Sequence, residues 1–117
     1  MITPSPFRIE YRRPDSLGPD EVDALWAVFQ TVASTTREVL LDGLRAMDEI
    51  FLVSRAGAVA GFGGVRVFHP EWQGRRHCLI ATGRVCLTPE LRGRNVIHQV
   101  GLRYYLRERR AHPRWPI

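Results

Sequence analysis

The residues best suited to chemistry lie between positions 85 and 98, in the segment Val85-Cys86-Leu87-Thr88-Pro89-Glu90-Leu91-Arg92-Gly93-Arg94-Asn95-Val96-Ile97-His98. An apolar strand, a turn rich in Arg and Gly, and the start of a helix follow one another here. The first N–H groups of a helix have no partner within the helix, and together with the helix dipole they attract an anion. Arg92 and Arg94 add fixed positive charge beside those amides. The segment therefore predicts a site for a diphosphate.

Because of Asn95, the sequence does not determine whether the amides of this turn are free to bind a phosphate. Asn is a favourable residue at a helix N-cap, where its side chain could accept a hydrogen bond from the N–H of Ile97 or His98. The protein would then satisfy its own amides, and a phosphate would lose a donor. Asn also tolerates left-handed backbone angles better than most residues, which favours formation of the turn itself.

No catalytic residue is identified from the sequence. His77 is a possible base because its ordinary pKa lies near neutrality, although a surface position at a strand end explains it more simply. Cys78 and Cys86 show no paired His or Asp at a recognisable spacing, so neither is predicted to be a nucleophile. In one strand their α-carbons would lie roughly 26 Å apart, beyond disulfide reach. No metal site is predicted, because the chain has no CxxC or HxxxH pair.

The charge of the chain is concentrated near its end. All 17 basic residues are Arg, against 12 acids, for a net charge of +5, and residues 92–117 hold seven Arg and one acid. Arg103, Arg107 and Arg110 would share one face of a helix. Such a stripe suits an anionic partner and makes nucleic-acid binding an alternative, but no helix-turn-helix, zinc-finger or RNP pattern accompanies it. A stripe alone is usually a solvated helix face.

Strands and helices alternate in a way that can position this segment. Residues 7–12 alternate apolar and polar, as a half-buried strand does. Gly18-Pro19 begins a helix, and Thr35 with Glu38 has the form of a capping box that begins a second one. The apolar stripes of these two helices are Val22, Leu25, Phe29 and Val32, and then Leu40, Leu44 and Met47.

The second half of the chain is predicted to be mainly extended. Residues 50–54 and 58–68 form a hairpin, in which the glycines at 61, 63 and 64 indicate a bulge or a close approach of backbones. Residues 70–76 are a polar turn, 77–87 a third strand and 96–110 a helix, and a last strand begins near Trp115. The order is β-α-α-β-β-β-α-β, an α/β domain spanning residues 1–117 with no repeat or linker.

At residues 87–97 the chain resembles the GNAT superfamily of N-acetyltransferases. The family signature is Arg or Gln, two residues, Gly, one residue, then Gly or Ala, after a strand that ends in an apolar-x-Pro turn. Leu87-Thr88-Pro89 supplies the turn and Arg92-Gly93-Arg94 the first half of the signature. The element order is similar as well, so the resemblance covers nearly all 117 residues.

The resemblance implies a GNAT-like mixed sheet, binding of acetyl-CoA, and transfer of an acetyl group to a small-molecule or protein amine. Its cofactor-binding residues would be those of the strand end and the loop: Val85, Cys86, Leu87, Arg92, Gly93, Arg94, Asn95, Val96 and Ile97. Two positions depart from the signature. Asn95 replaces its first Gly, and Ile97 puts a branched side chain where the second Gly or Ala would let a phosphate approach.

Length is a third departure, because the family fold continues beyond the strand that begins near Trp115. We therefore expect an incomplete GNAT-like domain, the cofactor-binding portion. The alternative is a non-catalytic interaction module with a degenerate coenzyme A site, whose open sheet edge pairs with a second copy or a complementing chain. No apolar run is long enough for export or membrane insertion, so the expected compartment is the cytoplasm.

Overall fold

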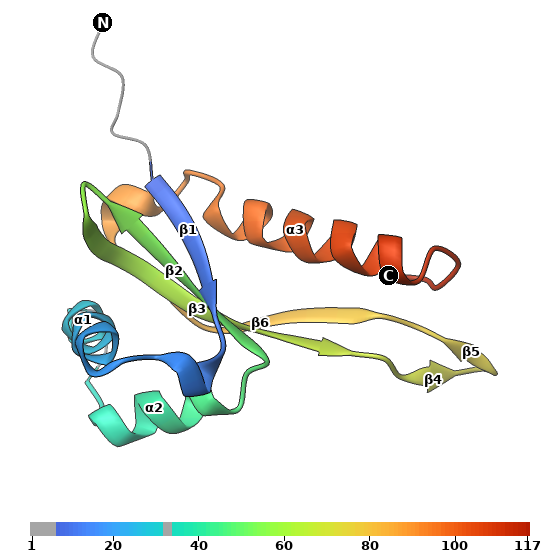
Figure 1. Ribbon diagram of the computed structural model, residues 1–117, viewed down its shortest axis with the longest axis horizontal. Coiled ribbons are helices and arrows are strands. Elements are labelled where there is room, and N and C mark those ends of the chain that lie inside the picture. Colours follow the sequence, from blue (N-terminus) through green and yellow to red (C-terminus); the bar gives the residue numbers. More distant parts are fainter. Residues whose placement is uncertain (1–6, 32–33) are drawn as a thin grey trace, which may run out of the picture.

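A four-stranded sheet of order β1-β2-β3-β6 forms the centre of the protein (Figure 1). The computed structural model describes residues 7–31 and 34–117. The strands are β1 (Phe7–Arg12), β2 (Glu49–Arg55), β3 (Ala58–Phe68) and β6 (Leu79–Leu87). Each pairs antiparallel with its neighbour. Between β3 and β6 the chain turns through a small hairpin of β4 (Glu71–Trp72) and β5 (Arg75–Arg76), within the predicted polar turn.

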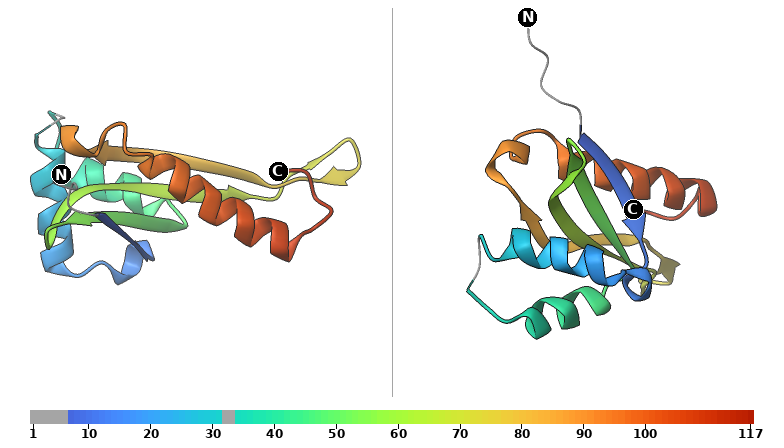
Figure 2. Two further views of the ribbon diagram at one scale, coloured as in Figure 1. Left: turned by 90° about the horizontal axis from the view of Figure 1, so that it is seen from above. Right: turned by 60° about the vertical axis from the view of Figure 1, so that its left-hand side comes forward.

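Helices cover both faces of the sheet (Figure 2). They are α1 (Pro19–Phe29), α2 (Arg37–Arg45) and α3 (Val96–Ala111), with the short 3-10 helices η1 (Pro14–Ser16) and η2 (Pro89–Leu91). The first core cluster joins α1 and α2 to one face of the sheet: Leu25, Val28, Leu40, Leu44, Ile50, Leu52, Phe62 and Cys86. The second cluster joins η2 and α3 to the other face: Phe51, Val53, Ala60, Val65, Leu91, Val96, Val100 and Tyr104. The fold class predicted from the sequence, GNAT-like α/β, is confirmed, and the predicted order of elements is observed as far as α3.

Three details differ from the sequence predictions. The cap of α2 is Thr36, one residue later than predicted, and its hydroxyl accepts a hydrogen bond from the N–H of Val39. The sheet was expected to be mixed, whereas its four strands all pair antiparallel. The strand expected from Trp115 is absent from the described residues. The N–H of Cys78 nevertheless donates to the carbonyl of Pro116 at 2.8 Å, so this segment lies beside the start of β6. Val32 falls outside the described residues.

The glycines of β3 permit close packing, as their pattern predicts. Gly63 lies opposite Phe51 in the register of β2 and β3, and a Cβ built on Gly63 would meet Phe51 Cζ and, at 2.6 Å, Phe51 Cε1. The Phe51 ring is fully buried. Because Gly63 has no side chain, the Phe51 ring has room to pack in the core beneath α3.

A bulge interrupts the pairing of β3 with β6. Phe62 faces Cys86 and Gly64 faces Gly83, so β6 contains one extra residue over this interval. Arg84 lies there in the left-handed region, at φ 54°, and its side chain crosses Gly43 of α2, where a Cβ would clash with the guanidinium. The bulge bends β6 just before its last residues, Val85 to Leu87.

Replacement of Gly63 by Ala should destabilise the protein by about 1–3 kcal/mol, because the added methyl group must displace the Phe51 ring. Gly101→Ala is the matched control. Gly101 lies in α3, nothing lies within 4 Å of its built Cβ, and Ala favours a helix over Gly by up to ~1 kcal/mol. Urea unfolding measures both changes, and equal stability of Gly63→Ala and the unaltered protein would contradict this packing.

Candidate functional site

The turn between β6 and α3 is fixed by a backbone hydrogen bond to β3 and by two side chains buried in the core. At the end of β6 the N–H of Thr88 donates to the carbonyl of Ala60 at 3.0 Å. Leu91 of η2 is fully buried, and Val96 is 2% exposed. Between them Gly93 has a φ of 80°, and Asn95, at φ 61° and ψ 28°, is the N-cap of α3. The two left-handed residues let the chain leave the sheet and enter the helix within a few residues.

The backbone amides at the start of α3 are not capped by the protein. The Asn95 side chain forms no capping hydrogen bond, so the alternative in which Asn95 satisfies these amides is wrong. The first hydrogen bond of the helix runs from the N–H of Gln99 to the carbonyl of Asn95 at 3.0 Å. Within residues 7–31 and 34–117, no acceptor is found for the N–H of Gly93 or for those of residues 95–98. These donors remain available to an anion.

A hollow of about 270 Å³ lies at these amides. It is lined by Leu87, Leu91, Gly93, Asn95, Val96, Ile97 and His98. Five of the nine cofactor-binding residues expected from the resemblance are thus brought together. The Ile97 side chain is 36% exposed and lies at the hollow rather than in the core. Nearby in sequence, the hydroxyl oxygen of Thr88 is buried and has no hydrogen-bond partner in the described part of the chain.

The other four expected residues do not line the hollow. Arg92 is exposed, and the guanidinium of Arg94 lies 5.6 Å from the centre of the Phe7 ring. Val85 is 40% exposed on β6, the last strand in the order of the sheet, so its outer edge faces no other strand among the described residues.

Cys86 points away from the hollow, towards α1. It is buried, and its Sγ lies 3.9 Å from the carbonyl oxygen of Val28. Burial raises the pKa of the Cys86 thiol, and the nearby charge of Arg92 opposes this only in part. The thiol is therefore poorly suited to act as a nucleophile, as its sequence context predicts.

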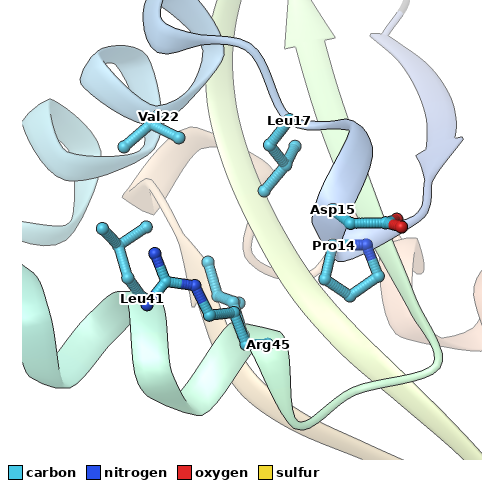
Figure 3. A pocket seen from close by; sticks show the side chains of 7 residues that line it. Pro14, Asp15, Leu17, Val22, Leu41 and Arg45 are labelled. Carbon is cyan, nitrogen blue, oxygen red and sulfur yellow. The ribbon is translucent and has the colours of Figure 1, made fainter.

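Another pocket, of about 250 Å³, lies at the opposite end of the sheet. Its walls are formed by residues of η1, α1 and α2 and the segment between them (Figure 3): Pro14, Asp15, Leu17, Val22, Leu41, Leu44 and Arg45. The charged groups at this pocket have partners of their own, since Arg45 pairs with Asp42 at 3.3 Å and Asp15 with Arg13 at 3.5 Å. The pocket presents no combination of nucleophile and base.

Two of the three Arg residues of the basic stripe on α3, Arg103 and Arg107, contact other groups of the protein itself. Arg103 lies over the Tyr11 ring at 3.9 Å, and Arg107 pairs with Glu49 at 2.8 Å. The hydroxyl of Tyr104 donates to the same carboxylate at 3.0 Å. Arg109 donates to two carbonyl oxygens of the segment after the helix. These contacts occupy three of the seven Arg residues between positions 92 and 117 without a nucleic acid, which weakens that alternative.

Sequence reasoning missed one group of side chains. His69, Glu108 and His112 converge where the C-terminal end of α3 meets the end of β3, and together they could hold a metal ion. The only signal in the sequence is the spacing of Glu108 and His112, four residues apart on one helix face. His77, which the sequence does indicate, lies beside the β4–β5 hairpin with its ring edge-on to Trp72.

Solved structures with a similar fold include GCN5-related N-acetyltransferases. One, from Kribbella flavida, is 21% identical with a TM-score of 0.58 over 92% of this chain and 28% of that one. An aminoglycoside N-acetyltransferase, AAC(6')-Iy, solved in complex with CoA, is 13% identical with a TM-score of 0.59 over 99% and 78%. A glucosamine N-acetyltransferase region of a fungal multi-domain β-N-acetylglucosaminidase is 20% identical with a TM-score of 0.57 over 89% and 13%.

These likenesses establish the fold: the chain has the GNAT fold indicated by its sequence. It spans 13% of the length of the fungal protein and 28% of that of the Kribbella protein. No protein-family model and no curated protein matches the sequence. Among the described residues, no helix has the length and apolar character needed to cross a membrane.

The buried hydroxyl of Tyr104 predicts a loss of stability at alkaline pH. Burial, followed by the hydrogen bond to Glu49, raises the pKa of Tyr104 above its ordinary value of 10. Above about pH 10 the unfolded chain releases this proton while the folded protein keeps it, so stability falls as the pH rises. Tyr104→Phe should make this decline shallower. Tyr105→Phe, at a residue 41% exposed, is the control and should leave it unchanged.

Urea unfolding from about pH 8.5 to about pH 11 would measure the decline. A residual decline is expected in Tyr104→Phe, because burial also raises the pKa of Tyr11. Identical pH dependence of Tyr104→Phe and the unaltered protein would contradict the assignment to Tyr104.

Proposed function

We propose that this chain binds acetyl-CoA at the turn between β6 and α3 and serves, in the cytoplasm, in the transfer of its acetyl group to an amine. The observation that carries the proposal is the set of unpaired amides at the start of α3, located at the carboxyl end of an edge strand. In a GNAT fold this is where a diphosphate would be held, and one neighbour of the same fold was solved in complex with CoA.

The residues present suit this group. A diphosphate needs several donors and positive charge, and the turn offers unpaired N–H groups and two guanidinium groups. Asn95 adopts the left-handed conformation that the Gly of the signature would supply, so its substitution preserves the path of the backbone. Ile97 narrows the hollow but leaves the amides uncapped.

The chain would contribute binding and orientation. Acetyl-CoA supplies the thioester that an amine attacks directly. The amides of residues 95–98, with Arg92 and Arg94, would anchor the diphosphate at the N-terminus of α3. The open edge of β6 around Val85 and Leu87 would bind the pantetheine arm by backbone hydrogen bonds, and a backbone N–H there would polarise the thioester carbonyl. No base or acid is assigned.

The acceptor is proposed to be an amine, of a small molecule or a protein. A structural neighbour, an aminoglycoside acetyltransferase from a soil metagenomic sample, was solved in complex with sisomicin. It is 12% identical to this chain, with a TM-score of 0.54 over 87% of this chain and 71% of that one. Nothing in the site selects among amines.

A second candidate function is an interaction module that pairs with another copy or a complementing chain. It is favoured by the open outer edge of β6 and by exposed apolar side chains on β6 and on α3. Leu79 is 56% exposed, Leu102 49% and Leu106 53%. An edge strand next to apolar surface is a common site of association. Sedimentation of the chain with and without acetyl-CoA would separate this function from cofactor binding.

Calorimetric titration with acetyl-CoA should show saturable binding, and the double variant Arg92→Ala/Arg94→Ala should weaken it at least about tenfold. Charge-assisted hydrogen bonds are worth about 1.5–3 kcal/mol each, and about 1.4 kcal/mol corresponds to a factor of ten. Arg110→Ala is the control, because it removes an exposed guanidinium at the other end of α3. Undiminished affinity in the double variant, or a flat titration of the unaltered chain, would reject the site.

Asn95 allows a second test of the same site, based on backbone conformation. Asn95→Gly should keep the affinity for acetyl-CoA, because Gly adopts φ 61° without strain. Asn95→Val should reduce it, since a β-branched residue disfavours this conformation by about 1–2 kcal/mol and would move the amides. Circular dichroism and titration of both variants provide the measurement. Equal affinity of the two variants would show that the geometry of the turn does not matter.

A further inference from the structure

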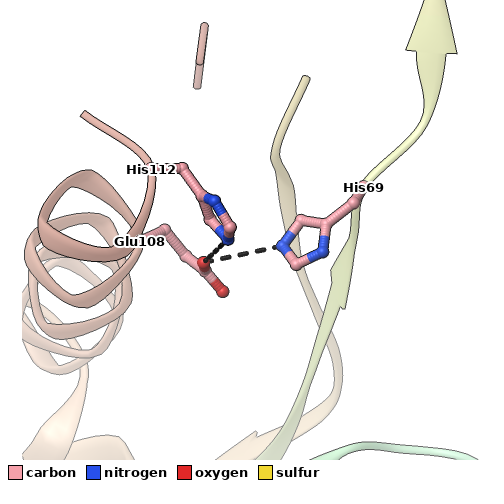
Figure 4. A group of neighbouring side chains, drawn as sticks. All are labelled: His69, Glu108 and His112. Atoms are coloured by element: carbon pink, nitrogen blue, oxygen red, sulfur yellow. Dashed lines mark ion pairs between the residues drawn. The ribbon is translucent and has the colours of Figure 1, made fainter. Parts of the chain in front are cut away.

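Three side chains at the C-terminal end of α3 point their ligand atoms at one another (Figure 4). Glu108 Oε2 lies 3.5 Å from His69 Nε2 and 3.9 Å from His112 Nε2, and all three atoms lie within 4.8 Å of one another. His69 follows β3, whereas Glu108 and His112 come from the last turn and the cap of α3. The group therefore joins two elements that are far apart in the sequence.

Glu108 is unusual in this group because its carboxylate is buried. Its side chain is only 8% exposed, and it is the one charged residue in the buried core of the described chain. Its carboxylate accepts no hydrogen bond from the described residues and lies only at ion-pair distances from the two histidines and Arg107. A buried carboxylate without a close partner is costly, whereas a coordinated cation would compensate for its lost hydration.

The two imidazole rings are held in place by aromatic contacts. The His112 ring stacks on Trp115 with ring centres 3.6 Å apart and planes within 5° of parallel. The His69 ring is edge-on to both, at 5.1 Å from His112 and 5.3 Å from Trp115. Arg109 donates to the carbonyl of Trp115 at 2.9 Å and so holds the segment that carries this ring. Rings fixed in this way favour a preorganised ligand set.

We propose that His69, Glu108 and His112 form a binding site for a divalent transition-metal ion of the zinc type. Tetrahedral zinc binds His nitrogen and carboxylate oxygen at about 2.0–2.2 Å, which puts neighbouring ligand atoms about 3.3 Å apart. The two contacts of Glu108 Oε2, at 3.5 and 3.9 Å, exceed this separation by about 0.2 and about 0.6 Å. The three ligand atoms lie within 4.8 Å of one another, so rotations of the side chains would have to bring them together by up to about 1.5 Å.

The ligand set is two neutral imidazoles and one carboxylate, which leaves a fourth position for water. Arg107 contacts the other oxygen of Glu108, Oε1, at 3.7 Å, and therefore leaves Oε2 to the metal. Coordination would fasten the end of α3 to the end of β3, next to the point where the N–H of Cys78 binds the carbonyl of Pro116. The ion would therefore stabilise this end of the domain.

Zinc titration of the full chain, followed with a chromogenic chelator, tests the site. One zinc ion per chain is expected, together with a rise of the thermal unfolding midpoint because zinc binds the folded state. His69→Ala, at a residue whose side chain is 39% exposed, and Glu108→Gln, which keeps the size of the side chain, should each weaken zinc binding more than about tenfold. Both should also abolish the rise of the unfolding midpoint.

His98→Ala is the matched control, since His98 is an exposed histidine at the opposite end of the same helix, and it should bind zinc as the unaltered chain does. Circular dichroism without metal confirms that each variant folds. Substitution with Co²⁺ should give ligand-field bands without a sulfur-to-cobalt band. Absence of zinc binding at submillimolar free zinc, equal binding by the His69 and Glu108 variants, or a sulfur band removed by Cys78→Ser would overturn the proposed ligand set.

Discussion

The burial of three side chains, Leu91, Val96 and Val100, fixes the start of α3 on the sheet, and the candidate site depends on it. Leu91 and Val100 are fully buried and Val96 is 2% exposed. Full burial of such side chains is worth about 1.5–3 kcal/mol each, enough to decide where a helix begins. Because Leu91 and Val96 flank the turn, the residues between them must leave and rejoin the core within four positions. This constraint imposes the left-handed conformations of Gly93 and Asn95 and directs the first amides of α3 away from the protein.

The elements of this fold could be predicted from sequence where one local signal dominates. Alternation in residues 7–12 and Pro19 at the first position of α1 predicted elements close to those observed, and the helix expected over residues 96–110 is found as α3. The cap of α2 was misplaced by one residue because Thr35 and Thr36 are chemically equivalent candidates, and only the entry of the chain into α2 distinguishes them. The prediction of a strand at Trp115 was wrong for another reason. A strand needs several backbone hydrogen bonds to a neighbouring strand, and this segment makes one to the residue before β6, from the N–H of Cys78 to Pro116.

The two sites differ in how far sequence could reveal them. The turn after β6 is local, since its donors, charges and conformation all come from consecutive residues. Its residue types and their spacing therefore indicate an anion site directly from the sequence. Even there, sequence could not tell whether Asn95 caps the helix, because capping depends on a side-chain rotamer. The group of His69, Glu108 and His112 is non-local. His69 lies 39 positions before Glu108, and only the packing of α3 on the sheet brings the two residues together.

The two sites lie at opposite ends of one helix, and the electrostatics of a helix suits both. The 16 residues of α3 extend about 24 Å. Its dipole makes the N-terminus attractive to anions and the C-terminus to cations. The acidic residue of α3 is at the C-terminal end, where a carboxylate is unfavourable unless a cation accompanies it. Arg107 meets this need at Oε1 and leaves Oε2 to the two imidazoles. The first turn of α3 thus has backbone amides without an acceptor, and its last turn has a carboxylate oxygen that faces only two imidazoles. These are the positions of α3 where an ion from outside would complete the electrostatics of the helix.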